Sequence, residues 1–278
     1  MSKYRLKELQ LELTKILSKA NIERAAREAQ LLLMDAYCCD ELWLLMHQDD
    51  LVEESALIEK AQRRAENEPL EYIINRVSFY SQEFFIDYGA LIPRPETELL
   101  IDEVLKRIPN KQQELCIVEV GVGSGIISIV LAQHLPNAKF IAVDISQYAL
   151  NIAAKNIERF GLEKRIELRL GSLLEPIHED IDYLVSNPPY IANDAPLESN
   201  LSYEPQNALF GGEVGDEIIQ ELLREFLKRG INHFSCEMGY DQEDKIKNFL
   251  KDTKFESLDF YKDLSGFDRG FTIKAKYE

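Results

Sequence analysis

Long hydrophobic runs are missing from this sequence of 278 residues, and basic residues are scarce. No stretch approaches the ~18–20 uninterrupted apolar residues that a membrane helix needs, and residues 1–20 contain no apolar core of a signal peptide. We therefore expect a cytoplasmic protein without a membrane partner. Asp and Glu number 49 against 32 Lys and Arg, which disfavours direct binding to nucleic acid because phosphate contacts need a basic stripe.

Cysteine and histidine are also sparse, at four residues each. The cysteines form no C-x-x-C pair and lie in apolar surroundings, so a zinc knuckle and a disulfide framework are both disfavoured. Buried, reduced thiols are expected instead for Cys38, Cys39, Cys116 and Cys236. The histidines are scattered without metal-ligand spacing, and the sequence predicts no metal site.

The hydrophobic pattern divides the chain into three segments. Residues 1–70 predict a small helical bundle, because apolar side chains recur there at helical spacing: Leu6, Leu9, Leu13, Ile16, Ala26, Ala29, Leu32 and Leu33. Residues 71–95 lose that period and become aromatic and β-branched, which predicts a β-hairpin linker. Residues 96–278 alternate short apolar runs with helical stretches, which indicates a Rossmann-like α/β domain with a mainly parallel, twisted sheet.

A glycine-rich turn follows the first predicted strand of the α/β domain. The stretch EVGVGSG (119–125) has glycine at three alternate positions, which lets the backbone turn sharply and lets a ligand approach closely. A dinucleotide fingerprint would need glycine in place of Ile126, and no G-K-[ST] follows, so NAD, FAD and P-loop sites are disfavoured. The ligand-binding residues predicted in this turn are Gly121, Val122, Gly123, Ser124 and Gly125.

The next predicted strand ends in AVDIS, which places Asp144 roughly 20 residues past the glycines. A carboxylate at this position can accept hydrogen bonds from both hydroxyls of an adenosine ribose, although it could also cap the helix that starts near Ser146. Ribose binding is the favoured interpretation, because the glycine turn stands one strand earlier. The two features together predict a cofactor that contains adenosine.

The stretch NPPY (187–190) follows the fourth apolar run, IDYLVS, at the sheet edge where the cofactor is expected. Pro188 and Pro189 fix φ at about −65° and remove two amide donors, so that acceptors are left exposed. The Asn187 side-chain oxygen and the Pro188 carbonyl can both accept hydrogen bonds from a planar NH₂ group, and the Tyr190 ring can stack on its flat face. The motif therefore predicts a site that holds an amide or an exocyclic amine.

Together, EVGVGSG, AVDIS and NPPY resemble the class I S-adenosylmethionine-dependent methyltransferases that modify planar amino groups. Four further stretches narrow the resemblance to the protein-(glutamine-N5) methyltransferases that act on peptide chain release factors: LIPRPETELL (91–100), YEPQNALFGGEVGD (203–216), CEMGYDQ (236–242) and KDLSGFDRGF (262–271). The resemblance runs from about residue 66 to the end, and a helical N-terminal domain also fits this family.

The resemblance implies transfer of a methyl group from S-adenosyl-L-methionine to the glutamine of the Gly-Gly-Gln motif in bacterial class 1 release factors, with S-adenosyl-L-homocysteine as product. It implies that residues 121–125 wrap the methionine part and the ribose, and that Asp144 takes the ribose hydroxyls. The implied catalytic residues are Asn187, Pro188 and Tyr190, and those implied to bind the substrate are Asn187, Pro188, Pro189, Tyr190 and Arg94.

The sequence departs from the family in the turn at Ser172 and Leu173 and in the linker, and the role of Arg94 has two interpretations. Ser172 and Leu173 follow the third strand, where the family usually has an acid for the adenine amino group, so adenine recognition is expected to be weaker or to use the backbone. Asn187 is expected to lie beside the cofactor as well. Arg94 is interpreted as bordering the cofactor or substrate, or else as part of a structural ion pair. The linker sequence NRVSFYSQ lacks the glycines that the family shows around FY, which leaves the hairpin turn open.

The long segment between Tyr190 and Gly215 is rich in Asn, Pro and Gly, and is interpreted as a lid that receives a protein loop, while the helical domain holds a second face of that partner.

Three other functions are compatible with part of this pattern. A glutamine methyltransferase of a ribosomal protein would share nearly every motif. A DNA adenine-N6 methyltransferase should carry a basic region, whereas residues 1–70 hold 10 Lys and Arg against 14 Asp and Glu. A non-catalytic adenosine-binding module would leave the acceptors of NPPY without a purpose.

Overall fold

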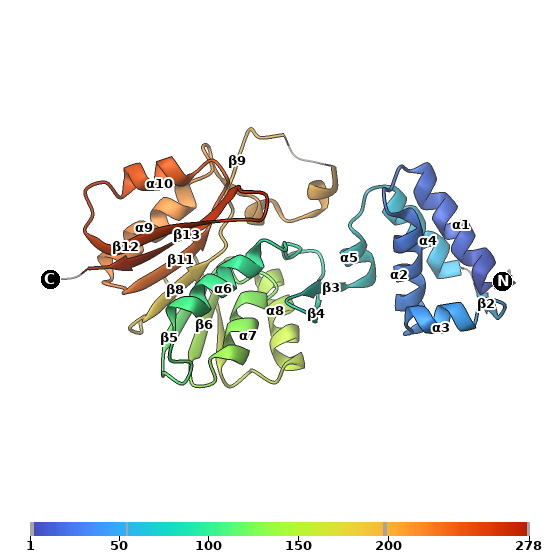
Figure 1. Ribbon diagram of the computed structural model, residues 1–278, viewed down its shortest axis with the longest axis horizontal. Helices are drawn as coiled ribbons and strands as arrows, with labels where there is room; N and C mark the ends of the chain where they lie inside the picture. The colour runs from blue at the N-terminus through green and yellow to red at the C-terminus, as the bar shows by residue number, and fades with distance from the viewer. Residues whose placement is uncertain (1–2, 54, 197–198, 277–278) are drawn as a thin grey trace. The chain divides into compact units, whose positions relative to one another are not determined.

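The computed structural model describes residues 3–53, 55–196 and 199–276 (Figure 1). Contacts divide the chain into two units, of which the first combines residues 1–76 with 198–203 and the second combines residues 77–197 with 204–278. None of the described helices has the length and apolar character that crossing a membrane requires.

The described part of the first unit holds helices α1 (Leu6–Lys19), α2 (Ala25–Tyr37), α3 (Glu41–Met46), α4 (Ser55–Ala65) and α5 (Leu70–Ile74). Buried leucines line one face of α1 and pack against α2 and α4: Leu6, Leu9, Leu13 and Leu17. The predicted bundle is present, although Ala26 is exposed and its neighbour Ala25 is buried instead. The helical period gave no sign of the antiparallel pair of β1 (Lys3–Arg5) and β2 (Leu51–Glu53).

The second unit is centred on a seven-stranded sheet with the order β12-β13-β11-β8-β5-β6-β7. Its strands are β5 (Cys116–Val120), β6 (Lys139–Asp144), β7 (Ile166–Leu170), β8 (Tyr183–Ser186), β11 (His233–Glu237), β12 (Phe255–Lys262) and β13 (Asp268–Ala275). Neighbouring strands from β11 to β7 run parallel, and β13 lies antiparallel between β11 and β12. The mainly parallel sheet predicted from the alternating runs is confirmed.

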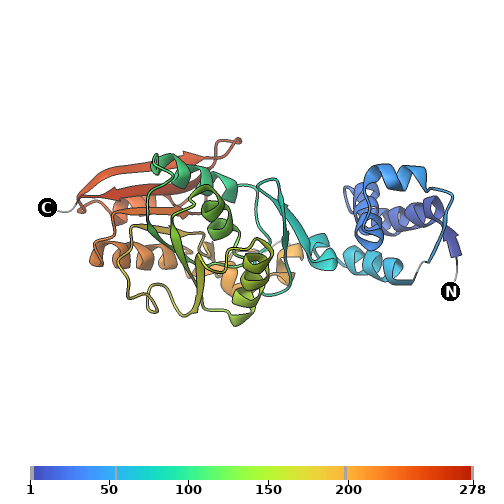
Figure 2. The ribbon, with the colours of Figure 1, turned by 90° about the horizontal axis from the view of Figure 1, so that it is seen from below.

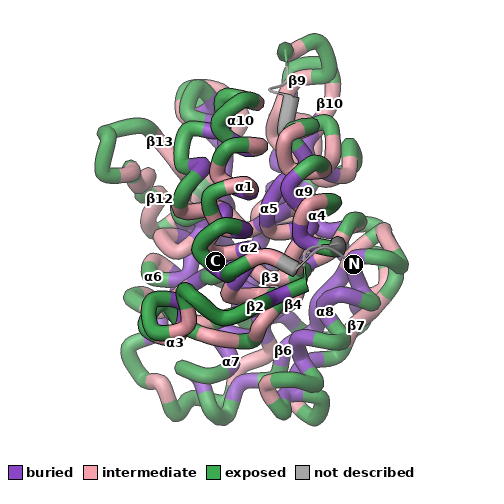
Figure 3. Tube along the Cα trace, turned by 90° about the vertical axis from the view of Figure 1, so that its right-hand side faces the viewer, coloured by how far each residue is buried: buried purple, intermediate pink, exposed green. Residues whose placement is uncertain are grey.

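Helices cover both faces of this sheet (Figures 1 and 2). One face carries α6 (Thr97–Arg107), α7 (Ile126–His134) and α8 (Gln147–Arg159), and the other carries α9 (Glu217–Lys228) and α10 (Glu243–Phe249). Buried and exposed residues alternate along α8 and α9 (Figure 3). By contrast α7 buries seven of its nine residues, because it contacts α6, α8 and the sheet at once.

The linker contains the predicted hairpin, formed by β3 (Arg76–Phe79) and β4 (Gln82–Phe85). Its turn forms without glycine, with Tyr80 and Ser81 both in the left-handed region at φ 50° and 57°. That conformation costs roughly 1–2 kcal/mol per residue. Tyr80 is held there by α6, because its amide donates to Glu98 at 2.7 Å and its hydroxyl donates to Asp102 at 2.7 Å. Residues 71–74, which were assigned to the linker, lie in α5.

A buried asparagine connects the hairpin to the glycine turn. Asn156 of α8 accepts a hydrogen bond from the Phe85 amide at 2.8 Å through Oδ1. Its Nδ2 donates to the carbonyls of Phe85 at 2.9 Å and Ser124 at 2.8 Å. The side chain therefore satisfies three backbone groups from two segments that are distant in sequence, and it fixes the glycine turn against β4.

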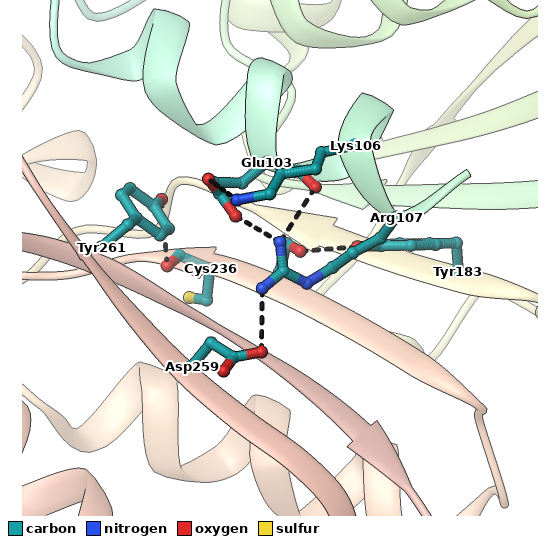
Figure 4. A network of polar contacts seen from close by, with 8 residues as sticks. Glu103, Lys106, Arg107, Tyr183, Cys236, Asp259 and Tyr261 are labelled. Carbon is teal, nitrogen blue, oxygen red and sulfur yellow. Dashed lines mark hydrogen bonds and ion pairs between the residues drawn. The ribbon is translucent and has the colours of Figure 1, made fainter. Parts of the chain in front are cut away.

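An arginine at the end of α6 ties this helix to the antiparallel end of the sheet (Figure 4). Arg107 pairs with Glu103 on its own helix and donates to Asp259 of β12 at 3.0 Å. On the neighbouring strands, Tyr183 of β8 and Ser235 of β11 share a hydrogen bond of 2.7 Å. The contacts of Arg107 hold the end of α6, while Thr97 in its first turn donates to Glu237 at the carboxyl end of β11.

All four cysteines are free thiols, but their burial differs from the prediction. Only Cys236 is fully buried, whereas Cys39 and Cys116 are half-buried and Cys38 is exposed. The expectation of a buried thiol is therefore wrong for Cys38, which ends α2 in the left-handed conformation. Within the described residues, no group of three or more His, Cys, Asp and Glu side chains could hold a metal ion.

We expect Asn156→Ala to lower the free energy of unfolding by on the order of 3 kcal/mol, because three buried backbone groups lose their partner. Asn151→Ala is the matched control, since Asn151 lies on the same helix but is exposed. Urea denaturation of both variants measures the difference. Equal stabilities of the two variants would show that Asn156 does not support the hairpin.

Candidate active site

The carboxyl ends of the parallel strands border a cavity of about 310 Å³. The glycine turn after β5, Asp144 at the end of β6, residues 171–173 after β7 and residues 187–189 after β8 all line it. Ligands of open parallel sheets bind at this edge. Residues that the sequence assigned to cofactor and amide binding after four separate strands thus surround one cavity, with Gly125 and Tyr190 as the exceptions.

The glycine turn depends on left-handed backbone conformations. Gly121, Gly123 and Gly125 have φ of +77°, +53° and +85°, which other residues rarely adopt. A Cβ on Gly123 would meet nothing within 4 Å, so this position requires glycine for its backbone and leaves space beside it. A Cβ on Gly125 would meet Ala153 of α8 at 3.2 Å, so this glycine serves helix packing instead.

Asp144 holds the turn from the neighbouring strand. Its Oδ2 accepts from the Gly123 amide at 3.0 Å, and its Oδ1 accepts from the Ser146 amide at 2.9 Å. The N-cap of α8 is Ser146, whose hydroxyl oxygen accepts from the Ala149 amide, so capping the helix does not occupy Asp144. Burial raises the pKa of Asp144, and its backbone hydrogen bonds act against this rise.

A second carboxylate, Glu119, lies behind the glycine turn and is only 1% exposed. Its Oε2 accepts from both the amide and the hydroxyl of Ser128. Its Oε1 has no hydrogen-bond partner among the described residues, and Glu119 lines the cavity. Burial raises the pKa of Glu119 to about 8. Since buried polar atoms are nearly always paired, this oxygen indicates where a donor or cationic group of a ligand would bind.

Asn187 begins a chain of buried hydrogen bonds. Its Nδ2 donates to the Thr97 hydroxyl at 3.2 Å, and that hydroxyl donates to Glu237 Oε2 at 2.8 Å. The Tyr190 hydroxyl donates to the other oxygen, Glu237 Oε1, at 3.2 Å. Tyr190 therefore does not line the cavity, and its ring packs against the core beside it. Burial raises the pKa of Glu237 to about 7 and that of Tyr190 beyond its ordinary value.

The remaining predicted residues also reach the cavity. Ser172 and Leu173 line it, and their turn contributes no carboxylate. Arg94 lines the cavity too, but its guanidinium pairs with Glu204. Glu204 is almost fully buried and accepts from the Ile92 amide at 3.0 Å. The ion pair that the sequence offered as one interpretation of Arg94 is thus present at the edge of the cavity.

The two ends of the segment between Tyr190 and Gly215 lie side by side. Parallel pairing joins β9 (Ile191–Ala192) to β10 (Phe210–Gly212), with the short 3₁₀ helices η1 (Ser199–Tyr203) and η2 (Gln206–Ala208) between them. Gln242 is buried and donates to the carbonyls of Tyr190 at 3.1 Å and Gly215 at 3.0 Å. Its Oε1 accepts from the Gly239 amide at 2.9 Å. The sequence alone does not reveal that this side chain closes the segment.

Sequence reasoning therefore missed four polar residues at the site: Thr97, Glu119, Glu237 and Gln242. All four stood within stretches that carried the family resemblance, but without an assigned role. The available signal was the position of the two acids, because Glu119 and Glu237 each interrupt an apolar strand near its carboxyl end. A charged residue in a fully buried strand is rare unless it has partners there.

The strand order, the glycine turn and the cavity at the carboxyl edge define the fold of class I methyltransferases. The hMettl16 catalytic domain, a human structure solved in complex with a 3′UTR hairpin, shares this fold with a TM-score of 0.59 at 18% identity, over 79% of this chain and 83% of that one. The PrmC N-terminal domain model matches residues 8–74, and the methyltransferase small domain model matches residues 95–203.

Curated relatives of similar length show the family to which this chain belongs. A release factor glutamine methyltransferase of Koribacter versatilis is 37% identical over 92% of this chain and 93% of its own. Another of that name, from Clostridium botulinum, is 35% identical over 98% of this chain and 99% of its own. The chain therefore belongs to the release factor glutamine methyltransferase family.

The raised pKa of Glu119 gives a testable dependence of stability on pH. The folded value of about 8 lies above the ordinary 4.5, so the wild type loses stability as pH rises between these values, by up to ~1.4 kcal/mol per pH unit. Glu119→Gln removes this loss. The free energy of unfolding of the variant relative to wild type should therefore increase from about pH 5 to about pH 8.

Urea denaturation across this pH range provides the measurement, and Glu158→Gln, on the exposed side of α8, is the control. Other buried acids, including Glu237, contribute equally to both proteins and cancel in the difference. Parallel pH curves for wild type and Glu119→Gln would contradict the assignment.

Proposed function

We propose that this protein transfers a methyl group from S-adenosyl-L-methionine to the side-chain amide nitrogen of the glutamine in the Gly-Gly-Gln motif of class 1 peptide chain release factors. One observation carries the proposal beyond family membership. The Asn187 amide nitrogen is engaged by Thr97, and Asn187 lines the cavity, so its oxygen is the end that is left to accept a hydrogen bond from a bound NH₂ group.

The residues around the cavity fit S-adenosyl-L-methionine. Asp144 retains lone pairs for ribose hydroxyls after its two backbone contacts, and the open side of Gly123 gives space for close approach. The unpartnered Oε1 of Glu119 suits the ammonium of the methionine part. Ser172 and Leu173 would border the adenine. When bound, this cofactor supplies a methyl group that is already activated by its sulfonium.

Because the methyl group is activated, the protein has mainly to align and orient the target amide, and alignment alone can supply several kcal/mol. Acceptance of the NH₂ hydrogens by Asn187 and by the Pro188 carbonyl draws electron density toward the nitrogen. The same acceptors become more favourable as positive charge develops on that nitrogen. A histidine or cysteine nucleophile is not required for this chemistry.

The other residues of the motif support this arrangement. Pro188 and Pro189 restrict the backbone that presents the acceptors. Tyr190 anchors the motif to Glu237 through its hydroxyl, and stacking of its ring on the target amide, which the sequence suggested, stays a prediction. Arg94 at the rim would contact the substrate or hold the segment that carries Glu204.

Two alternatives share the amide pocket but receive less support. Glutamine methyltransferases of ribosomal proteins and adenine-N6 methyltransferases of DNA would also use acceptors at NPPY. The full-length relatives and the match to the PrmC N-terminal domain over residues 8–74 favour a release factor as the partner. The acidic balance of the chain, with 49 Asp and Glu against 32 Lys and Arg, gives no support to DNA.

Incubation of the purified protein with labelled S-adenosyl-L-methionine and a class 1 release factor tests the function. We expect one methyl group per release factor, on the glutamine of the Gly-Gly-Gln motif, and no labelling when that glutamine is changed to alanine. A ribosomal extract and duplex DNA serve as competing substrates. Labelling of either of these, with the release factor unlabelled, would overturn the proposal.

Asp144→Ala should weaken binding of S-adenosyl-L-homocysteine by about 1.5–3 kcal/mol for each lost charge-assisted hydrogen bond, which corresponds to a Kd higher by roughly tenfold or more. Calorimetry gives the Kd, and the melting temperature shows whether the glycine turn still folds. Asp252→Ala, at an exposed aspartate outside the cavity lining, is the control. An unchanged Kd in Asp144→Ala would remove this residue from the cofactor site.

A further inference from the structure

Two buried polar side chains adjoin the amide-binding motif, Thr97 in the lining of the cavity and Glu237 behind that lining. Thr97 and Glu237 are each 1% exposed, and they come from the first turn of α6 and the last residue of β11. Both contact the amide-binding motif, Thr97 through Asn187 and Glu237 through Tyr190. We infer that Thr97 and Glu237 are positioning residues that set which end of the Asn187 side chain faces the target amide, an inference that rests on the proposed function.

The direction of each hydrogen bond fixes the orientation of Asn187. An ionised carboxylate can only accept, so Glu237 receives the proton of the Thr97 hydroxyl. Once its single proton is used, the Thr97 oxygen can only accept from Asn187, and only the Nδ2 end of that side chain can donate. The ionised Glu237 thereby fixes the direction of the Thr97 hydroxyl, and that hydroxyl fixes the orientation of the Asn187 side chain.

The orientation matters because the two ends of the amide side chain have opposite hydrogen-bonding character. With Nδ2 toward Thr97, Asn187 turns its oxygen to the cavity, where it can accept from the target NH₂. In the reversed orientation it would turn its own NH₂ toward that group, so that two donors would face each other. An asparagine without a partner could adopt either orientation, and the reversed one would lack the transition-state acceptor.

Tyr190 uses the second oxygen of the same carboxylate, which fixes Glu237 from the side of β8. Both ends of the NPPY motif are therefore tied to one charge. The environment of that charge is mixed, with one cation and several neutral or acidic groups near it on the adjoining elements: Arg269 on β13, Glu96 before α6, Tyr261 on β12 and Cys236 on β11. Arg269 is itself paired with Asp263 at 2.8 Å.

Protonation of Glu237 would remove this control. A neutral carboxyl can donate to the Thr97 oxygen, and the Thr97 proton is then free to point at Asn187 and favour the reversed orientation. Burial raises the pKa of Glu237 to about 7, so the change falls within an accessible pH range. Protonation of Glu237 should therefore lower the rate of methyl transfer without removing any group that touches the substrate.

The first test replaces the Thr97 hydroxyl. Thr97→Val keeps the shape but cannot relay the hydrogen bond, and we expect kcat to fall by about 10²-fold while the Kd for S-adenosyl-L-homocysteine stays within about twofold of wild type. Thr97→Ser restores the hydroxyl and should recover most of the rate. Thr272→Val is the matched control, because Thr272 is equally buried but its hydroxyl has no partner among the described residues.

The second test asks whether Thr97 acts through Asn187. In a double-mutant cycle with Asn187→Ala, the change Thr97→Val should have little further effect, because the oriented side chain is already absent. Additive losses would place Thr97 outside this chain and overturn the inference. A Thr97→Ser variant as slow as Thr97→Val would also overturn it, since packing rather than the hydroxyl would then matter.

The third test is the pH profile of kcat/KM. The wild type should lose activity about tenfold per pH unit below about pH 7, as expected for one ionised group that is required. Glu237→Gln cannot accept from both hydroxyls at once, so it should be slower at pH 8 and should lack the fall on the acid side. Thr97→Val should also lack it. A wild-type profile in either variant contradicts the inference.

The outcomes separate this inference from the proposed function. If the wild type methylates the release factor and Thr97→Val is equally active, the positioning role is wrong and the proposed function stands. If the wild type binds S-adenosyl-L-homocysteine but labels no release factor, the proposed function is wrong. Cofactor binding and melting temperature of each variant, measured in the same preparations, show that the rates refer to folded protein.

Discussion

The pairing of β5 with β8 is the constraint on which the site depends. Its register sets Val120 opposite Ser186, and the Ser186 hydroxyl donates to the Val120 carbonyl at 2.7 Å. The next residues on the two strands are Gly121 and Asn187, so the glycine turn and the amide motif emerge side by side. A slip of one residue would turn every side chain of β8 to the opposite face and would separate the two halves of the cavity.

β8 also lies between two strands that each carry a buried acid near the carboxyl edge. Glu119 lies on β5 and Glu237 on β11, with the motif-bearing strand between them. In surroundings of low polarity, carboxylates interact with a nearby positive charge more strongly than in water. A cationic ligand in the cavity would therefore favour the ionised form of Glu119, whose pKa is raised by burial, and burial of both acids is tolerated because hydroxyl or amide donors satisfy at least part of each.

Most of the architecture could be predicted from the sequence because it depends on local patterns. The helical period, the apolar runs and the glycine turn predicted the bundle, the parallel sheet and the cavity edge, and Asp144 and Asn187 followed from residue type at a strand end. The contacts of Thr97 with Glu237 and of Gln242 with Tyr190 join residues that are 140 and 52 positions apart. No local pattern encodes such partners. The turn at Tyr80 and Ser81 was left open for the same reason, since distant contacts from α6 hold it.

The tie made by Gln242 has a consequence for how the family can diversify. Because one side chain fastens the backbone at Tyr190 and at Gly215, the segment between them is a closed loop whose two ends do not depend on its contents. Lengthening such a loop changes its closure entropy only slowly, by ~0.6 kcal/mol for each doubling. Insertions and substitutions in this loop that leave the buried Glu204 and its pairing with Arg94 intact can therefore accumulate without displacing NPPY, so selection for a new protein partner can act on the loop while the chemistry stays constant.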